Sequence, residues 1–584
     1  MAFNVSENAA YTVLFVTLVV FTLLAIGSAD FMSPYVPQTV ASLFCLSQPK
    51  VSGDGRSMAT SGIDYFLAAR NSAGVWAIAV SYFASGMGAW VVYGTTEMGA
   101  NPQLSWLGVL GYSGASSFPA IIMSLLGPKI RRESQNHYAF STTDFGRQRY
   151  GRVMQVSIAC ISGFYMFIFI VAELTSISNV YALLTANSDS AFGILVTVIL
   201  GIFTVSYTGI GGLPASIVTD KFQGFIMFFL VVLLTVAVSS YDENHVNSSQ
   251  FSKSADITTE GLMAAITLFL AIASAEMFNQ STWQRVWAAK DEPTLRHGFC
   301  LGFFLVFLLM MFFGIMGMLA YANDPESYDN FEKFAFLAFF DILAPLPGGW
   351  HVMVLILVTA LAASSVDSLQ NGLTSIFYHD LVQIGWNPVW IARCLVVALN
   401  VPAIYLASKK FDVIALFLVA DLVCATAVFP TFLGLQRSDL LGGMLPAPTE
   451  LGAFLGILSG IGTVIVNGIV NDVDGGLFQY FWLENGGICA LCGSKTMVSF
   501  IVTPAMSALM TYVFSFIDIM ARGDRARKPL FLLDFDKDDY GTAADNNSID
   551  GEGSQNDFEG DGDDDYASSM KLESGRRDRD RIRS

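Results

Sequence analysis

The chain has 584 residues, of which 53% are hydrophobic and only 14% are charged, with a net charge of −18. This composition excludes an ordinary soluble enzyme and is typical of a protein that crosses a membrane many times. The five histidines are scattered, and no nucleophile–base pair or metal-ligand spacing occurs, so the sequence predicts neither an enzyme nor a cofactor. We expect a lipid bilayer around the chain and no nucleic-acid partner.

Apolar runs that are long enough to cross a bilayer, roughly 20 residues each, recur along the chain. Ten runs are clear, at residues 11–29, 71–96, 98–128, 153–172, 191–219, 222–240, 297–323, 342–366, 452–471 and 496–517. Three more are short or interrupted by charge, at residues 261–275, 390–408 and 411–436. The sequence therefore predicts an all-α protein with about 13 transmembrane helices.

The loop charges predict the orientation in the membrane. With the N-terminus outside, fifteen Lys and Arg residues fall on the cytoplasmic side and five on the other, as the positive-inside rule requires. The N-glycosylation pattern that begins at Asn247 then lies outside. No Lys or Arg precedes the first apolar run, so we expect a retained helix rather than a cleaved signal peptide. The expected location is the plasma membrane, with the C-terminus in the cytoplasm.

Two hydrophilic segments lie outside the predicted spans. Residues 521–584 are acidic at first and basic at the end, which predicts a disordered cytoplasmic tail. The tail could bind cytoplasmic regulators, and a solvated tail without a role in transport is the favoured alternative. Cys489 and Cys492 form a close pair in a loop. A disulfide is open if that loop is extracellular, whereas a single pair without further ligands does not favour a metal site.

Two segments of small residues are the most informative feature of the chain. Residues 84–88 read Ala-Ser-Gly-Met-Gly midway along one charge-free run, and residues 361–365 read Leu-Ala-Ala-Ser-Ser late in another. Glycine weakens a helix and frees backbone carbonyls, and adjacent hydroxyls supply further oxygen atoms. Such oxygens bind Na⁺, and transporters build ion sites from broken helices near the membrane midplane. A seam of small residues that only packs helices is an equally open interpretation.

Acidic side chains lie within or at the edge of the predicted spans, where charge is costly and therefore informative. These acids are Glu97, Glu173, Glu276, Asp367 and Asp421. No Lys or Arg is expected comparably deep, because Arg285 and Lys290 are interpreted as cytoplasmic anchors. An interior with acids and without fixed cations favours a neutral or cationic solute over an anion.

Individual acids differ in how strongly they indicate function. Residues at i and i+3 share a helix face, so Ser364 and Asp367 are expected to face the same cavity. Glu97 and Asp421 could equally lie in water near a helix end.

Four sequence blocks resemble the sodium/solute symporter family, which contains the sodium–glucose, sodium–proline and urea-active transporters. The first block runs from residues 65–71 into 84–90, and the second is 207–213 followed by 219–223. The third combines residues 278–280 with 284–285 and 288–290, and the fourth is 363–368. The blocks occur in the family order, and the apolar pattern extends the resemblance to about residue 520, without the loop 472–495 and the tail.

The resemblance implies a leucine-transporter-like fold, an inverted repeat of five plus five helices with one extra helix before it and two after it. The first repeat would cover residues 71–240 and the second residues 258–436. Residues 1–70 would hold the first helix and a cytoplasmic loop. Residues 449–520 would hold the two additional helices, and residues 521–584 would form the tail.

The resemblance also implies an ion site. Backbone oxygens of Ala84 and Met87, a backbone oxygen of Leu361, and the hydroxyls of Ser364 and Ser365 would bind Na⁺. Na⁺ is the only metal ion expected.

Further site residues follow from the same resemblance. Asp220 matches an acid on the path of the ion to the cytoplasm, and Asn279 matches a polar position that faces the solute. The expected substrate-binding residues are Gly86, Gly88, Glu276 and Asn279. Two departures matter, because Gly86 stands where sodium–proline members have an acid and Asp367 replaces a small residue. Asp367 could carry a proton or bind a second Na⁺, which leaves the coupling ion and the stoichiometry open.

These features predict a secondary active symporter that moves a small polar solute into the cell by alternating access, driven by a Na⁺ or H⁺ gradient. Urea or a polyamine is the favoured solute, since the acids suit a neutral or cationic molecule. A sodium-coupled amino acid or sugar symporter is the alternative. A transporter-like nutrient sensor and a channel-like facilitator are alternatives of another class.

Overall fold

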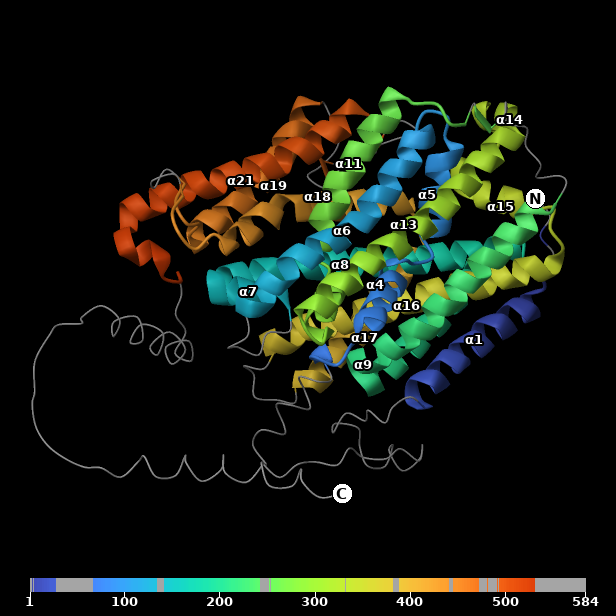
Figure 1. Cartoon of the computed structure of the whole chain (residues 1–584), viewed down its shortest axis with the longest axis horizontal. Helices are drawn as coiled ribbons and strands as arrows, with labels where there is room; N and C mark the ends of the chain where they lie inside the picture. The colour runs from blue at the N-terminus through green and yellow to red at the C-terminus, as the bar shows by residue number, and fades with distance from the viewer. Residues whose placement is uncertain are drawn as a thin grey trace, which may run out of the picture. The chain divides into compact units, whose positions relative to one another are not determined.

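The computed structural model describes residues 3, 5–27 and 67–530, except 134–140, 188, 242–250, 253, 331, 382–387, 441–444, 472–479, 482–490 and 492. Within these residues the regular elements are all helices and no β-strand occurs (Figure 1), which confirms the all-α class. Asn247, Cys489, Cys492 and the tail after residue 530 lie outside this description, so the interpretations of them stay predictions.

The helices follow the order of the predicted apolar runs. The first half of the chain contains α1 (Glu7–Gly27), α4 (Val75–Gly86), α5 (Val91–Ala100), α6 (Ser105–Glu133), α7 (Thr142–Arg149), α8 (Arg152–Leu184), α9 (Ser190–Ser239), α11 (Thr259–Glu276) and α12 (Gln280–Ala288). The second half contains α13 (Glu292–Asn323), α14 (Pro325–Asp329), α15 (Ala338–Leu343), α16 (Gly348–Leu381), α17 (Pro388–Ala407), α18 (Val413–Phe432), α19 (Glu450–Val470) and α21 (Ser494–Arg522). The described residues also form three 3-10 helices: η2 (Ala335–Leu337) and η4 (Leu433–Leu435) between α-helices, and η7 (Gly523–Arg527) after α21.

The number of membrane spans differs slightly from the prediction. Among the described residues, eleven helices are long and apolar enough to cross a membrane, and the bent pair α4–α5 makes twelve. The described apolar part of α17, Cys394–Ala407, is shorter than a full span, so the predicted count of 13 is not confirmed. The long α9 contains two spans, because Gly212 has a positive φ of 61° at a kink between them.

The break predicted at residues 84–88 is present. The helix α4 ends at Gly86, α5 begins at Val91, and the two are bent by 73°. Met87 has an extended backbone, with φ −102° and ψ 99°, so the helical hydrogen-bond pattern stops there. A second break separates α11 from α12, where the side chain of Asn279 accepts a hydrogen bond from the backbone N–H of Ser281 and caps α12.

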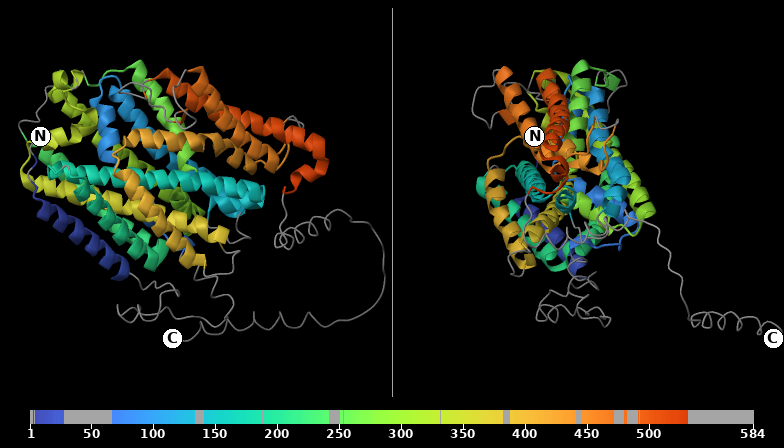
Figure 2. Two further views of the ribbon diagram at one scale, coloured as in Figure 1. Left: turned by 180° about the vertical axis from the view of Figure 1, so that it is seen from behind. Right: turned by 90° about the vertical axis from the view of Figure 1, so that its left-hand side faces the viewer.

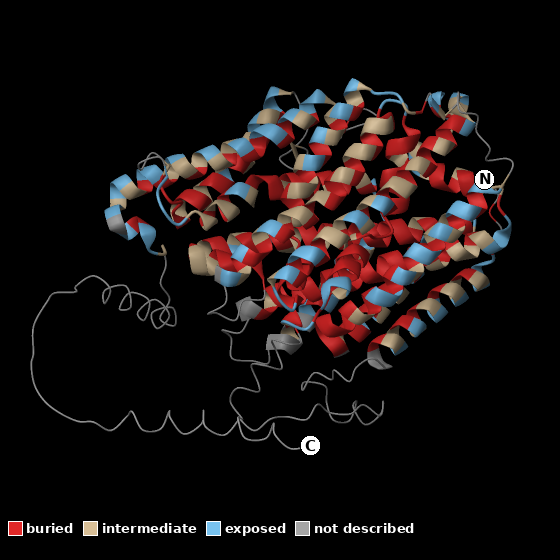
Figure 3. Ribbon diagram, viewed as in Figure 1, coloured by how far each residue is buried: buried red, intermediate tan, exposed pale blue. Residues whose placement is uncertain are grey.

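Burial places α16 at the centre of the helices. In its most apolar stretch 83% of α16 is buried, against 28% for α1 and 33% for α19 and α21. Figure 3 shows buried residues on the inner helices and exposed faces on α1 and α21. The helices α19 and α21 pack side by side, and α1 packs on α9 (Figures 1 and 2). The exposed faces of the outer helices are apolar, as at Leu23 and Met520, which is the surface that lipid covers.

Candidate transport site

The break between α4 and α5 lies against α16, so the structure brings the two segments of small residues together. The hydroxyl of Ser365 donates a hydrogen bond to the backbone oxygen of Ser85, at 3.1 Å. The expected Na⁺ ligands are all buried, namely Ala84, Met87, Leu361, Ser364 and Ser365. One backbone oxygen of the broken helix therefore faces a hydroxyl of α16, and transporters typically build intramembrane cation sites at such broken helices.

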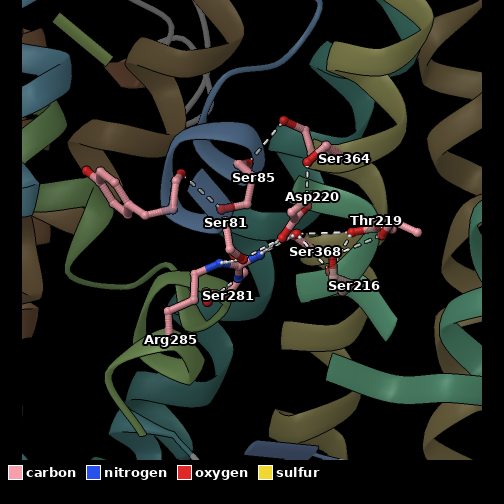
Figure 4. Close-up of polar contacts among 12 residues, drawn as sticks. Ser81, Ser85, Ser216, Thr219, Asp220, Ser281, Arg285, Ser364 and Ser368 are labelled. Atoms are coloured by element: carbon pink, nitrogen blue, oxygen red, sulfur yellow. Dashed lines mark hydrogen bonds and ion pairs between the residues drawn. The ribbon is translucent and has the colours of Figure 1, made fainter. Parts of the chain in front are cut away.

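A buried polar cluster lies next to this contact, as Figure 4 shows. The hydroxyl of Ser364 donates to Oδ1 of Asp220, at 2.6 Å. The other carboxylate oxygen of Asp220 accepts from the hydroxyl of Ser81 and from Nη2 of Arg285, the latter at 2.9 Å. Ser364 therefore links the expected ion site directly to Asp220.

Arg285 has no exposed side-chain surface and forms an ion pair with Asp220. Its guanidinium also donates to the hydroxyls of Ser81 and Ser368 and to the backbone oxygen of Ser281, at 2.6 to 2.9 Å (Figure 4). The interpretation of Arg285 as a cytoplasmic anchor, and of the interior as free of fixed cations, is therefore wrong. The short helix α12 starts after a break and carries Arg285 inward, and its nine residues are too few to register as an apolar run.

Asp367 lies at the other end of the same cluster. Its carboxylate accepts hydrogen bonds from the hydroxyls of Tyr207, at 2.7 Å, and Ser216, at 2.9 Å, both on α9. Ser368, which also binds the guanidinium, donates to the same carboxylate at 3.0 Å. Asp367 and Ser364 both contact side chains of α9, so they share a helix face. The expectation that they face one cavity is not confirmed, because neither lines the central cavity or the larger cavity described below.

A narrow cavity of about 50 Å³ lies beside the α4–α5 break. Six aromatic side chains line it, namely Tyr82, Trp90, Tyr112, Tyr165, Phe169 and Phe417. Two acids also line it, Glu276 at the end of α11 and Asp421 in α18. Tyr165 donates a hydrogen bond to Glu276, at 2.9 Å. Within the described part of the chain, neither Glu276 nor Asp421 forms an ion pair, so this central cavity has two carboxylates without a resident cation.

The four expected substrate-binding residues are placed differently. Gly86 and Glu276 line the central cavity. The amide of Asn279 donates to Glu276 at 3.2 Å while its oxygen caps α12, so its observed contacts position the acid. A side chain at Gly88 would collide with Glu173, which approaches the break from α8. Asn279 and Gly88 therefore support groups at the break and at the cavity wall.

A larger cavity of about 610 Å³ adjoins the central one, since Ile414 lines both. Glu97, Lys410 and Asp412 lie on its walls. It lies at the end of the helices where α1 begins, because Asn187 on its wall is hydrogen-bonded to Glu7 at 3.0 Å. In the predicted orientation this end is extracellular.

The aromatic walls of the central cavity were not predicted from the sequence. A pattern was present, because Tyr165 and Phe169 lie four residues apart on α8, and Phe417 and Asp421 lie four residues apart on α18. Residues at i and i+4 share a helix face. What the pattern does not show is that faces of α4, α6, α8, α11 and α18 meet, which depends on tertiary packing.

The family model that describes the sodium:solute symporter family matches residues 65–460, about two thirds of the chain. The chain belongs to the sodium:solute symporter family. The sequence resemblance is therefore confirmed, and the chain is a transporter-family protein with many membrane-spanning helices.

The chain is similar to two transporters of known type. The spermidine transporter DUR31 of Candida albicans is 27% identical over 445 residues, which cover 72% of this chain and 82% of that protein. The sodium/sialic acid symporter NanT of Aliivibrio fischeri is 23% identical over 216 residues, which cover 33% of this chain and 42% of NanT.

Solved structures confirm the fold. A Na⁺-coupled sialic acid symporter, in a substrate-bound outward-open state, matches with a TM-score of 0.62 and 15% identity over 87% of this chain and 98% of its own. Mhp1, a nucleobase-cation-symport-1 family transporter, matches with a TM-score of 0.52 and 11% identity over 78% of this chain and 95% of its own. The symporter thus has the leucine-transporter-like fold, whereas the exact bounds of its two repeats remain those predicted from the sequence.

Proposed function

We propose that this symporter moves a slim organic cation of the polyamine class into the cell together with Na⁺. The observation that carries the proposal is the central cavity, in which Glu276 and Asp421 lie among six aromatic side chains. Buried carboxylates without a cation are costly, and a solute with ammonium groups supplies the missing charge. Aromatic faces attract the same groups by cation–π interaction.

The fixed cation of the protein does not change this preference. Arg285 is absent from the lining of the central cavity, and Asp220 neutralises it within the buried cluster. An anionic solute would meet two carboxylates and no free guanidinium. A neutral or cationic solute is therefore still favoured over an anion, because the one fully buried cation among the described residues is already paired.

Charge and shape favour a polyamine over the other solutes considered. Urea is neutral and would leave both carboxylates without a counter-charge. A narrow cavity with apolar walls accommodates a linear aliphatic chain better than a sugar ring. The similarity to a named spermidine transporter supports the same class.

The coupling ion is proposed to bind where the α4–α5 break meets α16. Backbone oxygens of Ala84, Met87 and Leu361 and the hydroxyls of Ser364 and Ser365 are the proposed ligands, and their burial supports this role. Na⁺ bound there would favour the conformation that takes up solute from outside, and by reciprocity the solute would raise Na⁺ affinity. A membrane potential of about 100 mV contributes about 2.3 kcal/mol for each positive charge moved inward.

The test is uptake of radiolabelled solutes by a host that lacks its own transporters. Spermidine, putrescine, urea, proline and glucose are compared in Na⁺ medium and in medium with choline instead. We expect Na⁺-dependent accumulation of the polyamines and none of the neutral solutes. Accumulation of urea or glucose, or polyamine uptake that is indifferent to Na⁺, would contradict the proposal.

A pair of variants on one helix links uptake to the cavity. Glu276→Gln removes a cavity charge at the end of α11, whereas Glu260→Gln changes a partly exposed glutamate in the first turn of the same helix, away from the cavity. The first should raise the KM for spermidine at least about tenfold, the loss of one charged hydrogen-bond partner, and the second should leave it unchanged. Equal KM values in both variants would remove Glu276 from the substrate site.

A further inference from the structure

Glu173 on α8 reaches into the break between α4 and α5. The side chain is fully buried, and its Oε2 accepts a hydrogen bond from the backbone N–H of Ala89, at 2.8 Å. Ala89 belongs to the non-helical residues between the two helices. A carboxylate from a third helix therefore holds the backbone at the place where helical hydrogen bonding is interrupted.

The second carboxylate oxygen of Glu173 occupies the space beside Gly88. A Cβ atom at Gly88 would lie 1.4 Å from Oε1, so the approach is possible only because that residue has no side chain. The Ser365 side chain adjoins the carboxylate, but its hydroxyl donates to the backbone oxygen of Ser85. Within the described residues, Oε1 of Glu173 has no hydrogen-bond partner although it is buried.

Glu450 shows what a purely structural glutamate looks like in the same chain. It is also buried, and it also approaches a glycine, Gly151, which has a φ of +144°. Both of its oxygens are satisfied, because Oε1 accepts from the N–H of Val153 at 2.9 Å and Oε2 from that of Leu530 at 2.6 Å. Glu173 has the same setting, but one of its oxygens has no hydrogen-bond partner, and that oxygen lies beside Gly88, the residue that follows the proposed ligand Met87.

A buried carboxyl group with a free oxygen needs either a cation beside it or a proton on it. No ion pair involves Glu173 in the described residues, and the buried Arg285 is paired with Asp220. Carboxylate, hydroxyl and carbonyl oxygens together suit a hard cation. We propose that Glu173 is an additional, charged ligand of the coupling Na⁺, with Oε1 completing the site formed by the α4–α5 break and Ser365.

The proposal rests on Na⁺ coupling but not on the identity of the solute. Backbone and hydroxyl oxygens alone make a neutral site, whereas Glu173 adds one negative charge that balances one Na⁺. The ion would then tie α8, the α4–α5 break and α16 together.

The experiment measures equilibrium binding of ²²Na⁺ to the purified full-length protein without any organic solute. Glu173→Gln keeps the shape and the acceptor for Ala89 but removes the charge, and Glu450→Gln is the matched control. We expect Glu173→Gln to weaken Na⁺ binding at least tenfold. Glu450→Gln should leave Na⁺ binding unchanged, and Glu173→Asp should lie between the wild type and Glu173→Gln.

The outcomes separate the two proposals. If the wild type binds no Na⁺, the proposed Na⁺ coupling fails. If the wild type binds Na⁺ and folded Glu173→Gln binds it equally well, only the role of Glu173 is overturned. Should Glu173→Gln not fold, Glu173→Asp decides, because unchanged Na⁺ affinity with the shortened side chain overturns the proposal.

Discussion

Two buried acidic regions of this symporter differ in how their charge is balanced. The cluster around Asp220 contains its own cation, Arg285, and several hydroxyls that donate to its carboxylates. The central cavity has Glu276 and Asp421 with no ion-pair partner among the described residues. A region with its own counter-ion holds helices together, whereas a cavity without one can recruit a cation from outside. Whether the protein can bind a cationic solute therefore depends on which charges line the cavity, more than on how many charges lie inside the membrane.

The cluster joins elements that lie far apart in the sequence. Ser81 belongs to α4, Asp220 to α9, Arg285 to α12 and Ser364 to α16. Removing one partner of a buried ion pair leaves an uncompensated charge, which costs more than the pair itself contributes. We therefore expect substitutions in the cluster to lower the stability of the protein, and substitutions in the cavity to lower its affinity for the substrate.

The largest effect is expected for Arg285→Ala. The substitution leaves Asp220 buried without its cation, which should lower the free energy of unfolding by about 3–5 kcal/mol. The measurement is the thermal midpoint and the yield of folded protein in detergent. Arg132→Ala is the control, because the Arg132–Glu292 pair is exposed and such pairs contribute about 0–1 kcal/mol. Equal losses in both variants would mean that the buried pair is not structural.

Two neighbouring serines should separate ion binding from stability. Ser364 satisfies Asp220, whereas Ser365 donates to a backbone oxygen at the break. Ser364→Ala should lower stability by about 1–3 kcal/mol, the cost of an unsatisfied buried acceptor, and Ser365→Ala should do so less. Both variants should raise the Na⁺ concentration for half-maximal uptake, and this fold-increase should exceed any fold-change in surface abundance. Unchanged ion dependence in the double variant at normal expression would refute the ion site.

Asp367→Asn probes the other end of the cluster with a smaller effect on folding. The amide can keep hydrogen bonds with Tyr207 and Ser216 but removes the charge. If Asp367 carries a proton, uptake should lose its pH dependence while downhill exchange continues. If it binds a second Na⁺, the Hill coefficient for Na⁺ should fall. A wild-type pH profile and stoichiometry in this variant would leave only a structural role.

Parts of this account could be read from the sequence because they depend on local chemistry. Gly86 and Gly88 mark a break that the structure shows within two residues, and the spacing of Ser364 and Asp367 placed them on one face. The burial of Arg285 could not be predicted from the sequence, because it depends on the direction of α12 after the break that separates it from α11. Asp220 and Arg285 are 65 residues apart, and no local pattern joins them.

The same limit applies to the substrate site. Glu276 and Asp421 stood out as acids in apolar runs, but their shared cavity needs the packing of α11 against α18. Glu173 was visible as an acid, and its function at the break was not, because the contact with Ala89 bridges 84 residues. Residue type could therefore be used to predict which side chains matter, and tertiary structure was needed to show what they face.

The central claim, that unpaired acids in an aromatic cavity bind a polyamine, is tested most directly by equilibrium binding of radiolabelled spermidine to the purified protein in Na⁺ buffer. The account predicts saturable binding that putrescine displaces and urea and glucose do not. Glu276→Gln with Asp421→Asn should weaken it at least about a hundredfold, since each charge-assisted contact contributes about 1.5–3 kcal/mol. Unchanged affinity in this double variant at a normal thermal midpoint, or displacement by a neutral solute, would contradict the claim.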